Sequence, residues 1–342
     1  MSLPLVSICI PVKNAETTIA KTIKSLLNQT YSHIEIVVVD NASTDATVEI
    51  TESFKSSKIK IIQRSTDIGC DKNILTCHEF GNGKYTCVFH ADDVYESTII
   101  EKSIAILEKN PDVGIVFSLA NFINQNDHHI GQSKSFSQLK IKNDSVTYFS
   151  FQALFQKILL LNNFLITPSA VVRTELYQSI GSFRDDEITS SLDLDTWLRI
   201  TQHTKLALIN ERLINYRRSS MNGSTLINKG RTELADFFKV IDRWLLTPHV
   251  LKFLTKADHE NYNELKRRDL IVCAAKAVLQ GDPIKSKNLI LQEANKYQKN
   301  AFKTLNGIKY TFVKKLIELH TIVPKNFKNK ICLFLHKAIV NK

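Results

Sequence analysis

Short apolar runs alternate with helical patterns through the first half of the chain. Runs rich in β-branched residues predict strands over residues 6–12, 34–40, 59–64, 85–91 and 113–123. Between the first two strands, Ile19, Ile23, Leu26 and Leu27 follow the stripe of an amphipathic helix. Further helices are expected to begin near residues 43–45, 71 and 98. Strands that alternate with helices indicate βαβ crossovers, and therefore an α/β fold with a mainly parallel sheet flanked by helices.

Two of the predicted helices begin with capping patterns. Asn14 precedes the first helix and is expected to cap its amino terminus. Thr98 and Glu101 have the spacing of a capping box, in which the threonine and glutamate side chains accept hydrogen bonds from each other's backbone N–H groups. The capping box predicts that the fourth helix begins at Thr98.

The second half of the chain is less regular. Residues 124–147 are polar and predict a long loop or insertion. The remaining patterns predict a strand and a short helix over 167–183, a helix over 192–200, a strand or strand pair over 206–217, and helices from about residue 226 onward. We therefore predict an α/β domain over residues 1–225 and a helical C-terminal region over residues 226–342.

The positive charge of the chain is concentrated near its carboxyl end. Ten lysines and a single acid, Glu318, give residues 299–342 a net +9 of the chain's +11. Nucleic-acid-binding proteins cluster basic residues on the face or groove that meets the phosphates, so a charge confined to the tail argues against a nucleic-acid partner. Residues 302–323 place apolar residues at helical spacing beside lysines. This helix either packs on the domain or lies, within residues 300–342, on an anionic membrane surface.

The cysteines and the apolar runs bear on the cellular compartment. None of the six cysteines forms a CxxC pair, so reduced thiols are expected rather than disulfides or a zinc site. The first 30 residues contain no signal-peptide core, and no apolar run has the length of a membrane span. The sequence therefore predicts a cytoplasmic protein, peripheral on the inner face of the cell membrane if the tail binds lipid.

Polar residues follow three of the predicted strands: Lys13-Asn14, Asp40-Asn41 and His90 to Asp93. Ligands of open parallel α/β sheets bind beyond the carboxyl ends of the strands, where these residues should meet. Asp40 has two interpretations at this stage. It could cap the next helix, or it could accept an N–H group of a nucleotide base beside amides that face phosphate.

Two acidic pairs are candidates for catalysis. Asp92 and Asp93 repel each other unless a cation binds between them, and carboxylate oxygens suit Mg²⁺ or Mn²⁺. The alternative is a pair of solvated turn aspartates, with His90 a half-buried histidine. Asp193 and Asp195 begin a predicted helix, where they either complement the helix dipole or supply a general base.

The order and spacing of these motifs are more specific than any one of them. The block "VSICIPVKNAETTIAKTIKSLLNQTYSHIEIVVVDNASTDAT" is followed by "HADD", "LDLDTWLR" and "YRRSS". This succession, over about residues 5–220, resembles the family 2 glycosyltransferases. The resemblance implies the GT-A fold, a Rossmann-like mixed sheet, here with a helical C-terminal extension. It also implies inverting transfer of a sugar from a nucleotide donor, with a divalent metal and one carboxylate base.

The family motifs imply a role for each matching residue. Asp92 matches the metal-binding acid of an acid-any-acid triplet, with His90 in the place of the first acid, and Asp193 matches the general base. The positions implied for donor binding are Pro11, Lys13, Asn14, Asp40, Lys72 and Asp93. Asp195, Trp197 and Arg217 are further residues of the pattern.

Three residues depart from the family pattern. His90 replaces an acid, Leu192 replaces the acid before the base, and Ser219 stands where many members have a histidine. Among these substitutions, His90 could ligate the metal or contact the ribose or a phosphate instead, and Leu192 makes the surroundings of Asp193 more apolar. They therefore put the donor contacts and the metal dependence in question, while the key carboxylates remain.

Together these features predict a metal-dependent inverting glycosyltransferase that uses Mg²⁺ or Mn²⁺. It would transfer a hexose or N-acetylhexosamine from a UDP-linked donor to a hydroxyl of a glycan or lipid-linked acceptor, in surface polysaccharide biosynthesis. Two alternatives stay open at this stage. One is a nucleotidyltransferase, which uses the same carboxylates and metal but needs no Asp193. The other is a non-catalytic scaffold that binds sugar nucleotides.

Overall fold

The computed structural model describes residues 3–180, 188, 190–218, 230–296, 314–320, 328, 330–332 and 334–335. The chain forms two compact units, Met1–Phe155 with Asn163–Ser219 and Gln156–Asn162 with Ser220–Lys342. The predicted boundary at residue 225 lies outside the described residues, so it stays a prediction. None of the helices that the structure describes is long and apolar enough to cross a membrane.

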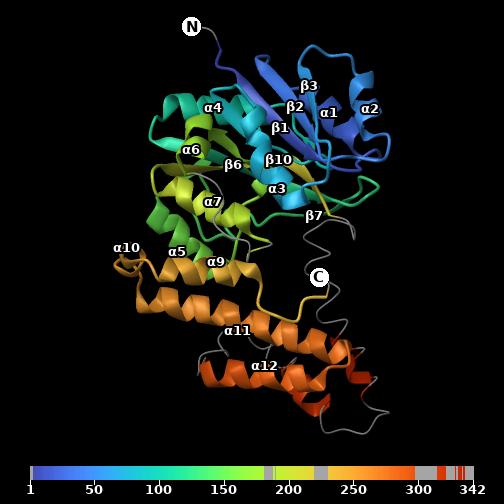
Figure 1. The fold of residues 1–342 in the computed structure, drawn as a ribbon. Helices are drawn as coiled ribbons and strands as arrows, with labels where there is room; N and C mark the ends of the chain where they lie inside the picture. Colours follow the sequence, from blue (N-terminus) through green and yellow to red (C-terminus); the bar gives the residue numbers. More distant parts are fainter. Residues whose placement is uncertain are drawn as a thin grey trace. The chain divides into compact units, whose positions relative to one another are not determined.

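The first unit is built on a ten-stranded sheet with the strand order β3-β2-β1-β4-β9-β6-β10-β5 (Figure 1). Strand β7 pairs with β6, and β8 pairs with β10. The strands are β1 (Val6–Val12), β2 (Ile34–Asp40), β3 (Ile59–Gln63), β4 (Tyr85–Val88), β5 (Val94–Tyr95), β6 (Val113–Ile123), β7 (His129–Gln132), β8 (Val146–Phe149), β9 (Val171–Arg173) and β10 (Lys205–Arg217). β1 is parallel to β2 and β4, β2 to β3, and β6 to β10, whereas β9 is antiparallel to both its neighbours. The predicted mainly parallel mixed sheet is confirmed.

The strands predicted from continuous apolar runs have the expected bounds. β1, β2 and β6 occupy the predicted ranges, and nearly all of their side chains are buried. Burial on both faces is what a strand in the middle of a helix-covered sheet requires, and it explains the continuous runs. β4 ends at Val88 rather than at Ala91, because the chain turns over the next residues and Asp93 N donates to His90 O at 3.5 Å.

The prediction of one long loop over residues 124–147 is wrong in part. Strand β7 lies within this range and pairs antiparallel with β6, so the two strands form a hairpin. The hairpin turn is closed by a hydrogen bond from Asn124 N to His128 O at 3.0 Å. The pattern missed this strand because its side chains are mostly exposed and polar, and they give no apolar alternation.

Helices bury their apolar stripes against this sheet. They are α1 (Ile19–Leu27), α2 (Thr47–Ser53), α3 (Cys70–Thr76), α4 (Ile99–Lys109), α6 (Thr174–Ile180) and α7 (Leu192–Thr201), with the 3-10 turns η1 (Cys77–Phe80) and η2 (Thr167–Ser169). Ile19, Ile23 and Leu26 of α1 are fully buried in one cluster with Ile8 and Ile36 of the sheet. Each such side chain contributes about 1.5–3 kcal/mol when it is fully buried, so the stripe holds α1 on the sheet.

The predicted cap of α1 is wrong, whereas α4 begins at Thr98 as predicted but without the capping-box hydrogen bonds. The N-cap of α1 is Thr18, and Asn14 has a positive φ of 50° that places it in the loop before the helix. Thr98 is the N-cap of α4, but its side chain makes no capping hydrogen bond. Glu101 instead accepts a hydrogen bond from Thr30 Oγ1 at 2.7 Å. In both places a partner far away in the sequence outcompetes the local interaction.

The second unit is helical, as its sequence pattern predicted. It contains α9 (Asp236–Leu245), α10 (Pro248–Leu251), α11 (Lys256–Leu279) and α12 (Pro283–Lys296), while α5 (Phe151–Leu161) contributes residues to both units. A capping box joins Thr255 and Asp258 at the start of α11.

Only part of the basic tail is described, and this part is packed. Residues 314–320 are helical, whereas the rest of the predicted helix over 302–323 lies outside the described residues. Ile317 and Leu335 are buried in a cluster with Ile271 and Ala274 of α11. Leu319 and Phe334 are 44% and 60% exposed. The described tail therefore has both a packed side and an exposed apolar side.

Candidate active site

Three parallel strands bring the predicted donor-binding residues to one edge of the sheet. β1 lies between β2 and β4, and Val12 pairs with Asp40 while Cys9 pairs with Val88. Lys13, Asp40 and the turn after β4 therefore follow neighbouring strand ends. Pro11 is the exception, because it lies within β1 opposite Val39 and not in the loop.

Asp40 combines a buried position with an incomplete set of hydrogen bonds. Its side chain is 3% exposed, and Oδ2 accepts a hydrogen bond from Ser43 N at 3.1 Å. Oδ1 has no hydrogen-bond partner among the residues that the structure describes. An unsatisfied buried acceptor costs about 1–3 kcal/mol, so this oxygen is suited to receive a donor from a ligand.

The loops after β1 and β2 are joined by side-chain hydrogen bonds. Asn14 N donates to Ser43 Oγ at 2.9 Å, and Asn14 Oδ1 accepts from Thr44 N at 2.9 Å. Asn14 therefore holds the two loops together instead of capping α1. Ser43, which accepts from Asn14 N, also donates its own backbone N–H to Asp40 Oδ2, so Asn14 is linked to Asp40 through this loop.

Asp67 is a site residue that sequence reasoning missed. It forms an ion pair with Lys13, accepts a hydrogen bond from Asn41 Nδ2 at 2.5 Å, and accepts another from Gly69 N at 2.8 Å. The hydrogen bond from Lys13 is the main reason why the pKa of Asp67 lies below its usual value. Asp67 lies two residues before Gly69, which has a φ of 88°. In the sequence, only this glycine could have indicated a turn at Asp67. Lys72, exposed in the first turn of the following helix α3, lies close in sequence.

The turn after β4 assembles a possible metal centre. His90, Asp92 and Asp93 each offer a ligand atom, and these atoms lie within 4.8 Å of one another. The Asp93 side chain is fully buried; Oδ1 accepts a hydrogen bond from Arg217 N at 2.7 Å, and Oδ2 lies 3.9 Å from His90 Nδ1. Within the described residues, Oδ2 has no hydrogen-bond partner. The structure thus places Asp93 in one group with Asp92 and His90.

The electrostatics of this turn favour a cation. Burial raises the pKa of Asp93 well above its usual value, and the neighbouring Asp92 raises it further. Burial also lowers the pKa of His90, although Asp92 and Asp193 act in the opposite direction. A buried acceptor without a partner, a second carboxylate and a neutral imidazole form a donor set that fits a divalent metal. An imidazole among the donors suits Mn²⁺ better than Mg²⁺, which prefers oxygen ligands.

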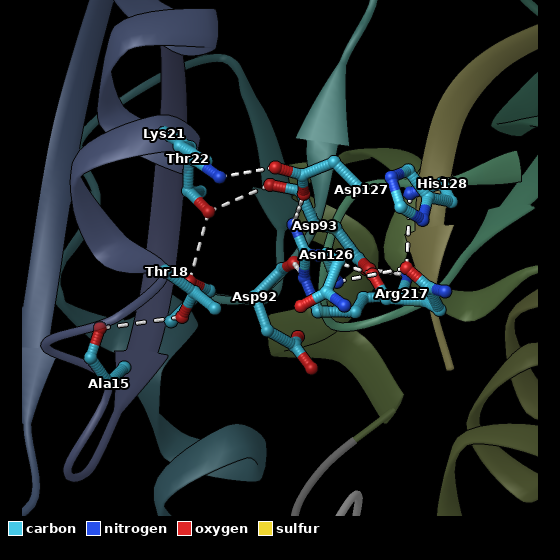
Figure 2. Close-up of polar contacts among 12 residues, drawn as sticks. Ala15, Thr18, Lys21, Thr22, Asp92, Asp93, Asn126, Asp127, His128 and Arg217 are labelled. Carbon is cyan, nitrogen blue, oxygen red and sulfur yellow. Dashed lines mark hydrogen bonds and ion pairs between the residues drawn. The ribbon is translucent and has the colours of Figure 1, made fainter. Parts of the chain in front are cut away.

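Arg217 fixes the shape of this turn (Figure 2). The guanidinium donates from Nε to Asp92 O and from Nη1 to Asn124 O, both at 2.7 Å, and it pairs with Asp127 at 2.6 Å. From the other side, Thr22 Oγ1 of α1 contacts Asp93 O at 2.7 Å. In Figure 2 the Asp92 carboxylate extends away from this network. Arg217 therefore positions the turn and is itself only 4% exposed.

The predicted base lies at the start of α7. Asp193 Oδ1 accepts a hydrogen bond from Leu194 N at 2.8 Å, and Oδ2 accepts one from the Thr167 hydroxyl. Burial raises the pKa of Asp71, and the charge of Asp193 raises it further; Asp193 also raises the pKa of His90, against the effect of burial. The structure therefore brings Asp193 into the electrostatic neighbourhood of His90.

The other residues predicted near the base have structural contacts. Asp195 forms an ion pair with Arg199 at 3.0 Å. Trp197 is 4% exposed and packs edge-on against Phe117, with ring centroids 5.3 Å apart. Leu192, in the place of a family acid, is the first residue of α7, whereas Ser219 lies outside the described residues.

Comparison with known proteins agrees with this geometry. The profile of the family described as glycosyl transferase family 2 matches residues 7–181. An uncharacterized glycosyltransferase of Haemophilus influenzae is 27% identical over 238 residues, which cover 69% of this chain and 72% of the relative. The Escherichia coli UDP-Glc:alpha-D-GlcNAc-diphosphoundecaprenol beta-1,3-glucosyltransferase WfaP is 32% identical over 123 residues, 36% of this chain and 48% of WfaP.

A solved structure shows the same fold. The mannosyltransferase PcManGT of Pyrobaculum calidifontis, in complex with GDP-Man and Mn²⁺, superposes with a TM-score of 0.52 at 16% identity. The match covers 100% of this chain and 87% of PcManGT. This similarity confirms the GT-A fold class. With a family profile that spans half of the sequence, the chain belongs to glycosyltransferase family 2 and is a sugar-transferring enzyme.

Proposed function

We propose that the protein transfers a sugar, with inversion, from a UDP-linked donor to a hydroxyl of a glycan or lipid-linked acceptor. One observation carries this proposal. Asp40 ends β2, and its Oδ1 has no partner among the described residues; the group of His90, Asp92 and Asp93 follows β4, on the other side of β1. One buried acceptor for a base and one acidic group for a metal, on neighbouring strand ends, suit the two ends of a nucleoside diphosphate.

On the donor side, each residue has a defined task in this proposal. Asp40 Oδ1 accepts the imide N–H of uracil, which satisfies the buried oxygen. Lys13 and Lys72 provide positive charge for the diphosphate, with Lys13 held in place by Asp67. His90, Asp92 and Asp93 would hold the metal, and such a cation would offset the charge that develops on the departing diphosphate.

On the acceptor side, Asp193 is the general base. Its carboxylate takes the proton of the acceptor hydroxyl while that oxygen attacks the anomeric carbon, and the bond to UDP breaks in the same step. The single displacement inverts the anomeric configuration. A nucleotidyl transfer would need no base at this position, so Asp193 distinguishes the two reactions.

The acceptor class is inferred from a relative. The name of WfaP gives a diphosphoundecaprenol-linked sugar as its acceptor. This relative supports a lipid-linked acceptor for the present chain, and with it a role in surface polysaccharide biosynthesis. Such an acceptor is held at a membrane. The lysines of residues 299–342 are therefore proposed to contact the anionic inner face of the cell membrane.

A donor screen tests the proposed function. Thermal unfolding of the full chain is measured with UDP-, GDP- and dTDP-sugars, with and without Mn²⁺, since a ligand that binds the native state stabilises it. We expect the largest shift from a UDP-sugar, and only with Mn²⁺ present. Turnover of this donor is then followed by UDP release. A shift from a GDP- or dTDP-sugar alone would contradict the assignment of the donor.

The test of the membrane proposal must leave the hydrophobic cluster around Ile271 intact. Deletion of residues 300–342 would expose the cluster around Ile271, because Ile317 and Leu335 belong to it. Replacing the exposed Leu319 and Phe334 together by serine avoids this problem. We expect weaker co-sedimentation with anionic vesicles for this variant than for Leu246→Ser, a change at an exposed leucine outside the tail. Equal sedimentation of the two variants would exclude a tail contact.

A further inference from the structure

The Thr167 hydroxyl links the predicted base to the interior of the first unit. It donates its single proton to Asp193 Oδ2, so its oxygen is left as an acceptor. Trp197 Nε1 lies 3.4 Å from this oxygen and donates to it. Trp197 follows Asp193 by one helical turn, and the two side chains therefore meet Thr167 from the same side of α7.

Thr167 is itself held rigidly. It begins η2, and Ile166 O accepts hydrogen bonds from Ser169 N at 2.8 Å and from Ser169 Oγ at 2.7 Å. The same hydroxyl of Ser169 accepts a hydrogen bond from Ser118 N of strand β6 at 3.1 Å. The turn that contains Thr167 is thus hydrogen-bonded to strand β6 of the sheet. The same sheet carries the residues of the donor side.

Trp197 is fixed by packing. Its ring packs edge-on against Phe117 and against Tyr177, with centroids 5.3 Å and 6.4 Å away. Edge-on aromatic pairs are stabilised beyond the area they bury, because the positive edge of one ring meets the negative face of the other. The indole N–H therefore points at Thr167 from a fixed direction, and it orients the hydroxyl toward Asp193.

Helix α7 does not depend on these two hydrogen bonds for its position. Leu194, Leu198 and Ile200 are fully buried beneath it. Arg199 Nη1 also donates to Ile180 O at 2.7 Å. Removal of the Thr167 hydroxyl should leave the helix in place and free only the carboxylate. Without the Thr167 hydroxyl, Asp193 Oδ2 would lose its hydrogen bond, while Oδ1 would still accept from Leu194 N.

We propose that Thr167 and Trp197 are positioning residues that set the orientation of the Asp193 carboxylate for proton abstraction. The inference rests on the proposed role of Asp193 as the base. With one hydrogen bond on each oxygen, the carboxylate keeps a fixed plane and a free lone pair on each oxygen toward an acceptor hydroxyl. Preorganisation of this kind lowers the entropy that the reaction must lose in reaching its transition state.

The test compares Thr167→Val, which keeps the shape but lacks the hydroxyl, with Thr167→Ser, which keeps the hydroxyl. UDP release is measured with the donor selected by the screen, and UDP affinity is measured alongside. We expect Thr167→Val to lower kcat by about 10- to 100-fold, as for a misplaced catalytic group, with the KM of the donor unchanged. Thr167→Ser should recover most of kcat, and Trp197→Phe should lose only a few-fold.

Two outcomes would overturn the inference. One is a kcat of Thr167→Val within about twofold of the wild type, since a misplaced group costs much more. The other is an equal loss of kcat in the valine and serine variants. Failure of the underlying assignment is recognised separately, because Asp193→Asn would then retain activity whatever the Thr167 variants do. A thermal unfolding midpoint within the wild-type range confirms that each variant is folded.

Discussion

The turn after β4 and the start of α7 both present carboxylates, but they are built differently. At the turn, the backbone is held by residues distant in sequence, Thr22 and Arg217, and Asp93 keeps an oxygen without a partner among the described residues. At α7, both oxygens of Asp193 already accept hydrogen bonds. A carboxylate that binds a cation needs an oxygen that accepts no hydrogen bond from the protein. A carboxylate that must abstract a proton is instead oriented by neutral donors.

Loss of a carboxylate charge at the turn should have a large effect. Asp92→Asn keeps the size of the side chain but removes the charge that a divalent metal requires. We expect transfer to fall by at least about 100-fold, because removal of one electrostatic stabiliser of a transition state has this effect. UDP release with excess Mn²⁺ measures the loss. Activity within threefold of the wild type would show that Asp92 does not serve the metal.

The base should respond differently from the turn. Asp193→Asn removes the proton acceptor, and it also loses one of the two hydrogen bonds that the carboxylate accepts, because the amide nitrogen can only donate. We expect kcat to fall by about 10²- to 10⁴-fold, the range of general acid–base catalysis, with unchanged Mn²⁺-dependent UDP affinity. Equilibrium titration measures the affinity. A parallel loss of UDP binding would mean that the two regions are not separate in function.

The scaffold of the turn can be weakened without touching its carboxylates. Asp127 pairs with Arg217, whose side chain is 4% exposed, and with Lys21, whose side chain is 57% exposed. Arg217→Met removes charge-assisted hydrogen bonds to Asp92 O and Asn124 O as well, and should lower the free energy of unfolding by about 2–3 kcal/mol. Lys21→Met should cost less than about 1 kcal/mol, as surface ion pairs usually do. Urea unfolding of the two variants would contradict this account if their losses were equal.

The smallest expected effect concerns the identity of the metal. His90→Asp replaces an imidazole by the acid that the family triplet has at this position. Because oxygen ligands suit Mg²⁺, we expect the ratio of activity with Mg²⁺ to activity with Mn²⁺ to rise by a few-fold. Activity assays with each metal alone measure this ratio. An unchanged ratio would place His90 outside the metal's ligands.

Much of the sheet could be predicted from the sequence, because its strands are apolar throughout. Residues 6–12, 34–40 and 113–123 have the same bounds in pattern and structure. Strand β7 could not be predicted, since an exposed edge strand carries no apolar alternation. The predicted capping hydrogen bonds failed for a related reason. Asn14 bonds with Thr44, and Glu101 with Thr30, and neither long-range partner is visible in a local window.

The site shows the same division between local and long-range information. Asp40, Asp92 and Asp193 were recognisable because each lies at the end of a strand or the start of a helix. Their supports were not recognisable. Asp67 reaches Lys13 across 54 positions, and Thr167 reaches Asp193 across 26, so only the fold brings these pairs together. Sequence reasoning finds the candidate groups for the reaction, and the structure shows which residues hold them.

The central claim is that the turn after β4 binds a divalent metal that is needed for the nucleotide donor. It is tested most directly by calorimetric titration of UDP into the full chain, with Mn²⁺ and with EDTA, beside Asp92→Asn. We predict that Mn²⁺ strengthens UDP binding by at least about tenfold in the wild type, which corresponds to 1.4 kcal/mol, and not in the variant. Equal UDP affinity with Mn²⁺ and with EDTA, or an equal gain from Mn²⁺ in Asp92→Asn, would contradict it.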